Sequence, residues 1–158
     1  MRGEAFAITS LQDRSFRSTL AFFFTDEIVL CSFDVFQALW MMFAPGRRDA
    51  DVAAWCAAMR AKAGRVVLIP DREIASVRVT FRMMQNQLFI ARERAGVDAA
   101  GYRTVHRPAP VVYRFLLLER EETGAATQRL ARRFGTRFEI AATRAYAFAH
   151  RRAPWLTR

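Results

Sequence analysis

The chain of 158 residues has few of the residue types that build catalytic and metal centres. It contains two histidines, two cysteines and one lysine, and the cysteines lack a CxxC or Cys/His spacing. Cys31 and Cys56 lie inside apolar runs, as buried cysteines without a redox or metal role commonly do. The GxGxxG, GxxxxGK[ST] and GxSxG motifs are also missing. We therefore expect no cofactor, no metal site and no enzymatic activity.

Long hydrophobic runs are missing as well. The most apolar segment, residues 28–44, carries Asp34 and Gln37 and falls short of the ~20 apolar residues that a membrane-spanning helix needs. No apolar h-region follows Arg2, so no secretory signal is expected. No Ser/Gly/Pro-rich linker divides the chain. These features predict a single cytoplasmic domain over residues 1–158.

The chain is rich in apolar residues and in arginine. Hydrophobic residues make up 53% of it, including 14 phenylalanines, so a core can form without disulfide or metal. The net charge is +10, and 24 of the 25 basic residues are arginine. Residues 1–63 carry seven basic and seven acidic residues, whereas residues 129–158 carry eight basic residues and one acidic residue. The excess positive charge is therefore a property of the C-terminal part.

The strongest structural signal is residues 17–33, which predict two β-strands joined at Thr25-Asp26-Glu27. Apolar residues recur with period two, and many are aromatic or β-branched. The pattern predicts a β-hairpin with a buried aromatic face. The residues that share a face are Leu20, Phe22 and Phe24 on the first strand, and Ile28 and Leu30 on the second.

A helical insertion is expected over residues 33–64. Residues 33–44 have helical length and apolar residues on every side, which indicates a helix covered all round. This segment has two interpretations: internal core or homodimer contact, or a membrane-dipping anchor beside Arg47-Arg48. A second helix, capped by Asp49 or Asp51, is predicted through Ala63 before Gly64. The candidate interface residues are Trp40, Met41, Met42 and Phe43, and the expected packed face of the second helix is Val52, Trp55, Cys56 and Met59.

The middle of the chain predicts an antiparallel meander with one wet face. Strands are expected at residues 65–69, 73–82 and 87–91, and in the second of these Val77, Val79 and Phe81 alternate with polar residues. The continuous apolarity of residues 111–118 predicts a central strand covered on both sides, and residues 102–106 could add a short edge strand.

Beyond residue 123 the pattern becomes helical. A first helix is expected to end at Gly135, with Ala126, Leu130, Ala131 and Phe134 along its apolar stripe. Thr136 and Glu139 have the spacing of a capping box, which predicts a last helix through about His150. The expected apolar side of this helix is Phe138, Ala141, Ala142, Ala145 and Phe148. The alternation of alanine with larger residues near the end leaves a final strand as the alternative.

The segment 17–32 resembles the strand-turn-strand signature of the pleckstrin-homology-like (PH-like) superfamily, in the form found in GRAM and bacterial PH domains. That signature is a basic or small residue, an apolar strand ending in Thr-Asp or Thr-Asn, and a second apolar strand ending near Ser. Residues 69–77 resemble the family's later strand entry, "Ile-Pro … Ile … Val". A strand like Leu88-Phe-Ile90 and a strand-to-helix ending like residues 111–134 follow in the expected order, so the resemblance covers roughly residues 15–134.

This resemblance implies an α+β fold with a strongly bent antiparallel sheet or partly open barrel, closed at one corner by a C-terminal helix. It also implies a binding or scaffold module with no chemistry of its own. Some relatives bind phosphoinositides and many bind proteins, but the basic motif of the lipid-binding members is not recognisable here. The insertion 33–64 and the helix after Thr136 depart from the family pattern.

The C-terminal arginines are the candidate anion- or partner-binding residues. A positive face along the last two helices would attract anionic lipid by ~1 kcal/mol per basic residue, or nucleic-acid phosphates through counterion release. We expect a protein partner, a homo-oligomer or an anionic membrane surface; the alternative is a small basic nucleic-acid-binding protein that also uses Arg78 and Arg82. Arginine can also simply solvate a helix. The candidates are Arg129, Arg132, Arg133, Arg137, Arg144, Arg151 and Arg152.

Overall fold

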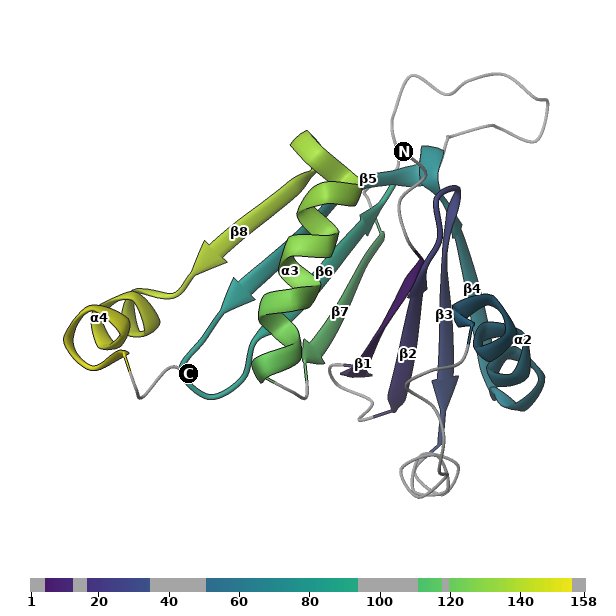
Figure 1. The fold of residues 1–158 in the computed structure, drawn as a ribbon, viewed down its shortest axis with the longest axis horizontal. Helices are drawn as coiled ribbons and strands as arrows, with labels where there is room; N and C mark the ends of the chain where they lie inside the picture. Colours follow the sequence, from purple (N-terminus) through teal and green to yellow (C-terminus); the bar gives the residue numbers. More distant parts are fainter. Residues whose placement is uncertain (1–4, 13–16, 35–50, 94–110, 118–119, 155–158) are drawn as a thin grey trace.

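The computed structural model describes residues 5–12, 17–34, 51–93, 111–117 and 120–154, and these form an α+β fold. Eight strands join in one sheet in the order β4-β3-β2-β1-β7-β6-β5-β8. All the neighbouring pairs in this sheet are antiparallel except β5 and β8, which are parallel. The sheet is open, with β4 and β8 at its edges (Figure 1). The strands are β1 (Phe6–Gln12), β2 (Ser18–Phe23), β3 (Glu27–Phe33), β4 (Arg65–Pro70), β5 (Ile74–Phe81), β6 (Gln87–Arg92), β7 (Val111–Leu117) and β8 (Phe138–Ala142).

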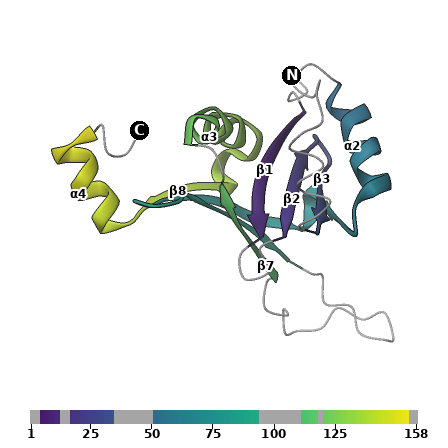
Figure 2. The ribbon, with the colours of Figure 1, turned by 90° about the horizontal axis from the view of Figure 1, so that it is seen from below.

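Three α-helices accompany the sheet within the described ranges. They are α2 (Val52–Lys62), α3 (Arg120–Phe134) and α4 (Arg144–Arg152), and two 3₁₀ turns, η1 (Asp71–Glu73) and η2 (Gly135–Arg137), connect elements. Figure 2 shows that the sheet bends, so that β1–β3 stand at a steep angle to β5 and β8. Helix α3 lies inside this bend, whereas α2 lies on the opposite face of β3.

The main core fills the inside of the bend. Strands on both halves of the sheet contribute, and Leu130 and Phe134 of α3 close it. Phe134 meets the Phe23 ring edge-on at 6.3 Å, and Phe23 in turn stacks on Phe6 at 4.8 Å. A second, smaller core lies between the hairpin and α2, where the Phe22 and Trp55 rings meet edge-on at 5.2 Å. Helix α3 and helix α2 therefore each cover one face of the hairpin.

The predicted hairpin is confirmed, and its burial is greater than a single face. The register pairs Phe22 with Val29 and Phe23 with Ile28, so successive residues enter different cores. Leu20 and Phe22 are buried against α2, whereas Ile28 and Leu30 are buried in the bend; Phe24 is half-buried beside the smaller core.

Helix α2 agrees with its sequence prediction. Asp51 is the N-cap, and its carboxylate accepts a hydrogen bond from the Ala53 amide at 3.0 Å. Cys56 and Met59 are buried, and Val52 and Trp55 pack beside them. The expected helix at 33–44, with its interface residues Trp40, Met41, Met42 and Phe43, and the expected edge strand at 102–106 lie outside the described residues.

Three sequence expectations are wrong or incomplete. Strand β1 was not expected, because its Ala, Thr, Ser and Gln residues dilute the signal from Phe6 and Ile8. The last helix does not begin at Thr136: residues 138–142 form β8, and Glu139 is a strand residue paired with Arg78 instead of a capping-box carboxylate. Strand β7 is central in the order but is not covered on both sides, since Val112 is 53% exposed.

Gly135 ends α3 as predicted. It has a φ of 53°, a left-handed conformation that glycine adopts without steric cost. The chain then turns through η2 and pairs with β5 from Val77 to Phe81. This turn carries the C-terminal arginines away from α3 and along the sheet edge.

Candidate functional site

Two of the candidate arginines are engaged within the protein. Arg137 Nη2 lies 3.0 Å from Asp71 Oδ2, and Arg137 Nη1 donates to the backbone carbonyl of Asp71 at 3.0 Å. Arg133 Nη2 lies 3.2 Å from Asp71 Oδ1, and Arg133 Nη1 donates to the Thr25 carbonyl at 2.9 Å. Both guanidinium groups therefore fasten the end of α3 to η1, and Arg133 also fastens it to the hairpin turn.

The environment of Arg133 is the more buried of the two. Its side chain is 10% exposed, and two of its nitrogens, Nε and Nη2, make no hydrogen bond with good geometry. Burial lowers the pKa of Arg133, and the charge of Asp71 opposes this effect. Arg133 is thus a structural cation that depends on Asp71.

Two further candidates, Arg129 and Arg132, are exposed on α3. The Arg129 guanidinium carbon lies 5.9 Å from the centre of the Phe6 ring, close to the limit of a cation–π contact. These two residues leave α3 with a small exposed positive area.

The side of α4 that faces β5 is anchored by hydrogen bonds and ring contacts. Thr143 is the N-cap, and its hydroxyl accepts from the Tyr146 amide at 3.3 Å while its own amide donates to the Phe81 carbonyl at 3.0 Å. The Tyr146 ring packs on Phe81 at 5.5 Å and stacks with His150 at 5.7 Å. These contacts fix the orientation of α4 at the end of β5.

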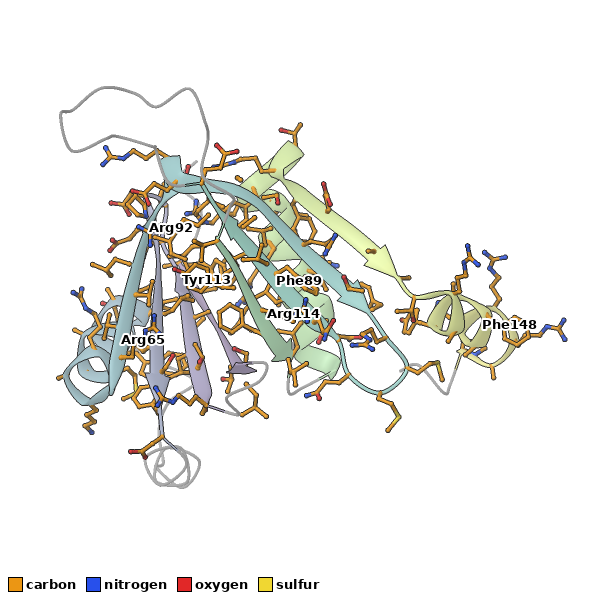
Figure 3. The ribbon with its side chains drawn as sticks, turned by 180° about the vertical axis from the view of Figure 1, so that it is seen from behind. Arg65, Phe89, Arg92, Tyr113, Arg114 and Phe148 are labelled. Carbon is orange, nitrogen blue, oxygen red and sulfur yellow. The ribbon has the colours of Figure 1, made fainter. Side chains whose placement is uncertain are left out.

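The outer side of α4 carries the remaining candidates around an exposed aromatic ring. Positions three, four and seven apart share one face of a helix, so Arg144, Phe148, Arg151 and Arg152 lie together. Phe148 is 65% exposed, and the Arg152 guanidinium carbon lies 5.3 Å from its ring centre. Figure 3 shows Phe148 projecting away from the body of the protein at the tip of α4. We call these four residues the α4 patch.

The structure divides the predicted positive face into two groups. Helix α4 lies beyond the end of β8, well apart from α3 in both Figure 1 and Figure 2. The group on α3 and η2 is partly used in internal contacts, whereas the group on α4 is exposed around Phe148. The first group is Arg129, Arg132, Arg133 and Arg137, and the second is Arg144, Arg151 and Arg152. The sequence pattern predicted that Phe148 lies on the packed side of a longer helix. Phe148 lies four residues from both Arg144 and Arg152, and this spacing is the signal that puts it on the exposed face of α4.

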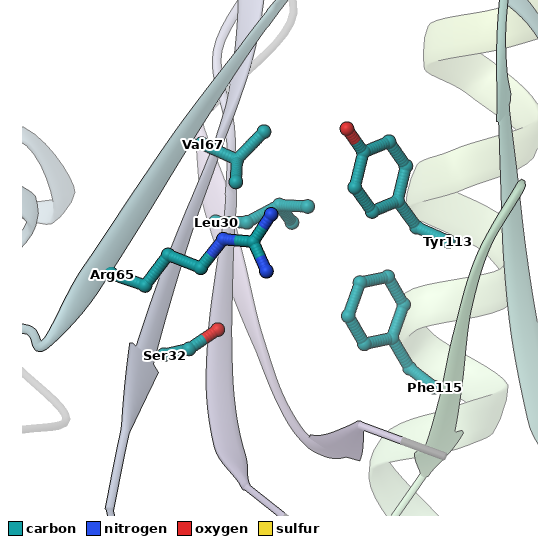
Figure 4. Close-up of a pocket in the computed structure, with 6 residues that line it drawn as sticks. All are labelled: Leu30, Ser32, Arg65, Val67, Tyr113 and Phe115. Carbon is teal, nitrogen blue, oxygen red and sulfur yellow. The ribbon is translucent and has the colours of Figure 1, made fainter. Parts of the chain in front are cut away.

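A second feature is a small cavity at one end of the bend. It measures about 40 Å³ and lies between β3, β4 and β7 (Figure 4). Sequence reasoning did not find this site, because its lining comes from strands far apart in the chain. The lining residues are Leu30, Ser32, Arg65, Val67, Tyr113 and Phe115.

Groups suited to covalent or metal chemistry are poorly placed. Burial is the main cause that raises the pKa of Cys31 to about 11, and burial likewise raises the pKa of Cys56, so both thiols stay protonated near neutral pH. The described part of the chain contains no cluster of three or more His, Cys, Asp or Glu side chains that could hold a metal ion. Among the described helices, none has the length and apolarity needed to cross a bilayer.

Neither a protein-family model nor a curated protein nor a solved structure matches this chain. The two features of this structure that bear on function are therefore the α4 patch and the cavity in the bend.

Proposed function

We propose that this protein is a non-enzymatic, PH-like binding module that docks on an anionic membrane surface through the α4 patch. The bent sheet, formed largely of antiparallel strands, and the helix α3 that follows β7 into the bend support the PH-like assignment. Helix α2, strand β8 and helix α4 are additions to that pattern, and the docking surface lies on the last of them.

The observation that carries the proposal is the exposed Phe148 ring among three arginines. Fully burying a phenylalanine side chain stabilises a protein by roughly 1.5–3 kcal/mol, so a ring that is 65% exposed can still gain roughly 1–2 kcal/mol by leaving water. Each arginine held near an anionic bilayer adds about 1 kcal/mol. The α4 patch therefore combines the two contributions that peripheral membrane binding requires.

The geometry favours a bilayer over a nucleic acid. The Arg152 guanidinium lies over the Phe148 ring, which makes this ring a poor open platform for a nucleobase. A membrane interface accepts the ring in the region of the acyl chains while lipid phosphates lie level with the guanidinium groups. A membrane also fits the position of α4 at one end of the protein, where Phe148 projects outward (Figure 3).

Flotation with vesicles tests this proposal directly. The full chain would be mixed with vesicles of phosphatidylcholine alone or with 30 mol% phosphatidylglycerol at physiological salt, with an oligonucleotide duplex and a single strand as competing ligands. Replacing Arg144, Arg151 and Arg152 together by Gln should weaken binding to the anionic vesicles about 100-fold, from ~1 kcal/mol per residue. Phe148→Ala should weaken it about 10-fold. The matched control, Arg129→Gln with Arg132→Gln on α3, should bind nearly as the unchanged protein does.

The outcomes separate the possible partners. Equal binding to neutral and anionic vesicles, or an unaffected triple variant, would refute docking through the α4 patch. Binding to oligonucleotides without binding to vesicles would instead establish the nucleic-acid alternative. Binding to neither would leave a protein partner, and the membrane proposal would be wrong.

A further inference from the structure

A row of polar side chains crosses the inner face of the bent sheet. The register places Ser10 of β1 beside Thr19 of β2, Thr19 beside Ser32 of β3, and Ser32 beside Arg65 of β4. Ser10 and Thr19 are fully buried and Ser32 is 7% exposed. The neighbouring positions on this face, such as Leu30, belong to the main core. The row therefore interrupts an apolar surface and ends at the cavity.

The hydrogen bonds along the row allow Ser32 to offer a donor to the cavity. Ser10 Oγ donates to the Thr19 carbonyl at 3.0 Å. Thr19 Oγ1 and Ser32 Oγ lie 3.1 Å apart, whereas the other acceptor near Thr19 Oγ1, the Arg17 carbonyl, is 3.5 Å away. Either of these two hydroxyl groups can be the donor in their mutual contact. When Thr19 donates to Ser32, the Ser32 hydroxyl keeps its own proton for an acceptor in the cavity.

Arg65 supplies the positive charge at the same place. Figure 4 shows its side chain reaching across the cavity toward Tyr113 and Phe115 of β7. Within the described residues the guanidinium of Arg65 has no hydrogen bond and no ion pair. A guanidinium and a hydroxyl thus converge on a cavity whose other walls include the apolar side chains of Leu30, Val67 and Phe115.

We propose that this cavity binds a carboxylate, with Arg65 and Ser32 as the donors. Two N–H or O–H donors and no lining acidic residue favour an anion or a strong acceptor. A buried water needs about 10–15 Å³ on this measure, so a cavity of about 40 Å³ holds roughly three water-sized groups. The three heavy atoms of a carboxylate fit this volume, and its two oxygens match the two donors. The rest of the ligand would extend through the open side of the cavity.

The carboxylate could belong to a free organic acid or to the C-terminus of a peptide. Both sources present the same group to Arg65 and Ser32, and the experiment can separate them. Figure 1 shows α4 at the opposite end of the protein from β3 and β4, whose residues line the cavity together with those of β7, so the two proposals are independent.

Nuclear magnetic resonance titrations of the full chain test this site. The probes are sodium propionate and its neutral analogue propionamide, with total ionic strength held constant, and a dipeptide with a free C-terminus against its amide. We expect saturable shifts of the Arg65 Nε–Hε and Ser32 amide signals with the charged probes and at least tenfold weaker binding of the neutral ones. The more tightly bound charged probe identifies the source of the carboxylate.

Variants make the assignment specific. Arg65→Gln, at an exposed side chain, should weaken binding of the charged probes at least tenfold, and Ser32→Ala should weaken it about threefold to tenfold. Arg151→Gln removes the same charge from α4 and should leave the affinity for the charged probes unchanged. Equal affinity for propionate and propionamide, no saturation, tighter binding of inorganic phosphate, or an unchanged Arg65→Gln variant would each overturn the proposal.

Discussion

Asp71 links the end of α3 to the rest of the protein, and Asp71→Asn should destabilise the fold measurably. The substitution keeps the size of the side chain and the backbone contacts, which include the Asp71 amide donating to the Asp26 carbonyl at 2.7 Å. It removes the negative charge that lies 3.0 Å from Arg137 Nη2 and 3.2 Å from Arg133 Nη2. Arg133, whose pKa burial already lowers, would then keep its charge without the carboxylate of Asp71 that opposes this effect.

The expected loss lies between the values for surface and buried ion pairs. Exposed pairs contribute about 0–1 kcal/mol, whereas removing one partner of a buried pair costs about 3–5 kcal/mol. The Asp71 side chain is 32% exposed and that of Arg133 is 10% exposed, so an intermediate loss of about 2 kcal/mol is expected. For a domain of this size that corresponds to a decrease in Tm of about 4–8 °C.

Urea unfolding followed by circular dichroism would measure this loss. Glu93→Gln removes an exposed carboxylate next to β6 and should change the free energy of unfolding by less than about 0.5 kcal/mol. A double-mutant cycle of Asp71→Asn with Arg137→Gln should give a coupling energy of about 1 kcal/mol, which should decrease in 1 M salt. If Asp71→Asn is no more destabilising than Glu93→Gln, these arginines do not fasten α3 through Asp71, and they become free candidates for binding again.

Two further predictions concern backbone conformation and thiol ionisation. Gly135→Ala should lower the free energy of unfolding by about 1 kcal/mol because the φ of Gly135 is 53°, whereas Gly124→Ala in α3 should raise it by about 0.5–1 kcal/mol. A Cβ at either position meets no atom within 4 Å, so steric contact does not distinguish the two sites. Equal effects in urea unfolding would contradict the backbone explanation. Because the pKa of Cys31 is raised from 9.0 to about 11, the unfolded chain loses this proton first, and the free energy of unfolding should fall as the pH rises from 9 to 11. Cys31→Ala should show a shallower decrease over this range, and an unchanged slope would argue against the raised pKa.

Local patterns predicted the elements whose signals are contained in a few neighbouring residues. The alternation in residues 17–33 indicated the hairpin. Asp49 and Asp51 were the two predicted caps of α2, and Asp51 is the cap in the structure; a cap is predictable because it acts on the next amide groups. Gly135 marked the end of α3 for the same local reason. The period-two pattern of β5 also placed Val77 and Val79 in the core.

The segment after Gly135 could not be read in this way. Thr136 and Glu139 have the spacing of a capping box, yet Phe138–Ala142 becomes a strand because β5 offers an unpaired edge to it. A parallel pairing of this kind depends on a strand about 60 residues earlier, which no local propensity contains. The same misreading placed Phe148 on a packed face, so the α4 patch was found in part, as arginines without their aromatic centre.

The sequence by itself determined the positive C-terminal part, the hairpin and the scarcity of catalytic side chains, because composition and short-range periodicity carry that information. Only the tertiary structure decided which arginines are available. It placed Arg133 and Arg137 on Asp71, whereas Arg144, Arg151 and Arg152 remain exposed beside Phe148. It also brought Ser32, Arg65 and Tyr113 around one cavity, since strand pairing and the bend of the sheet place distant segments face to face.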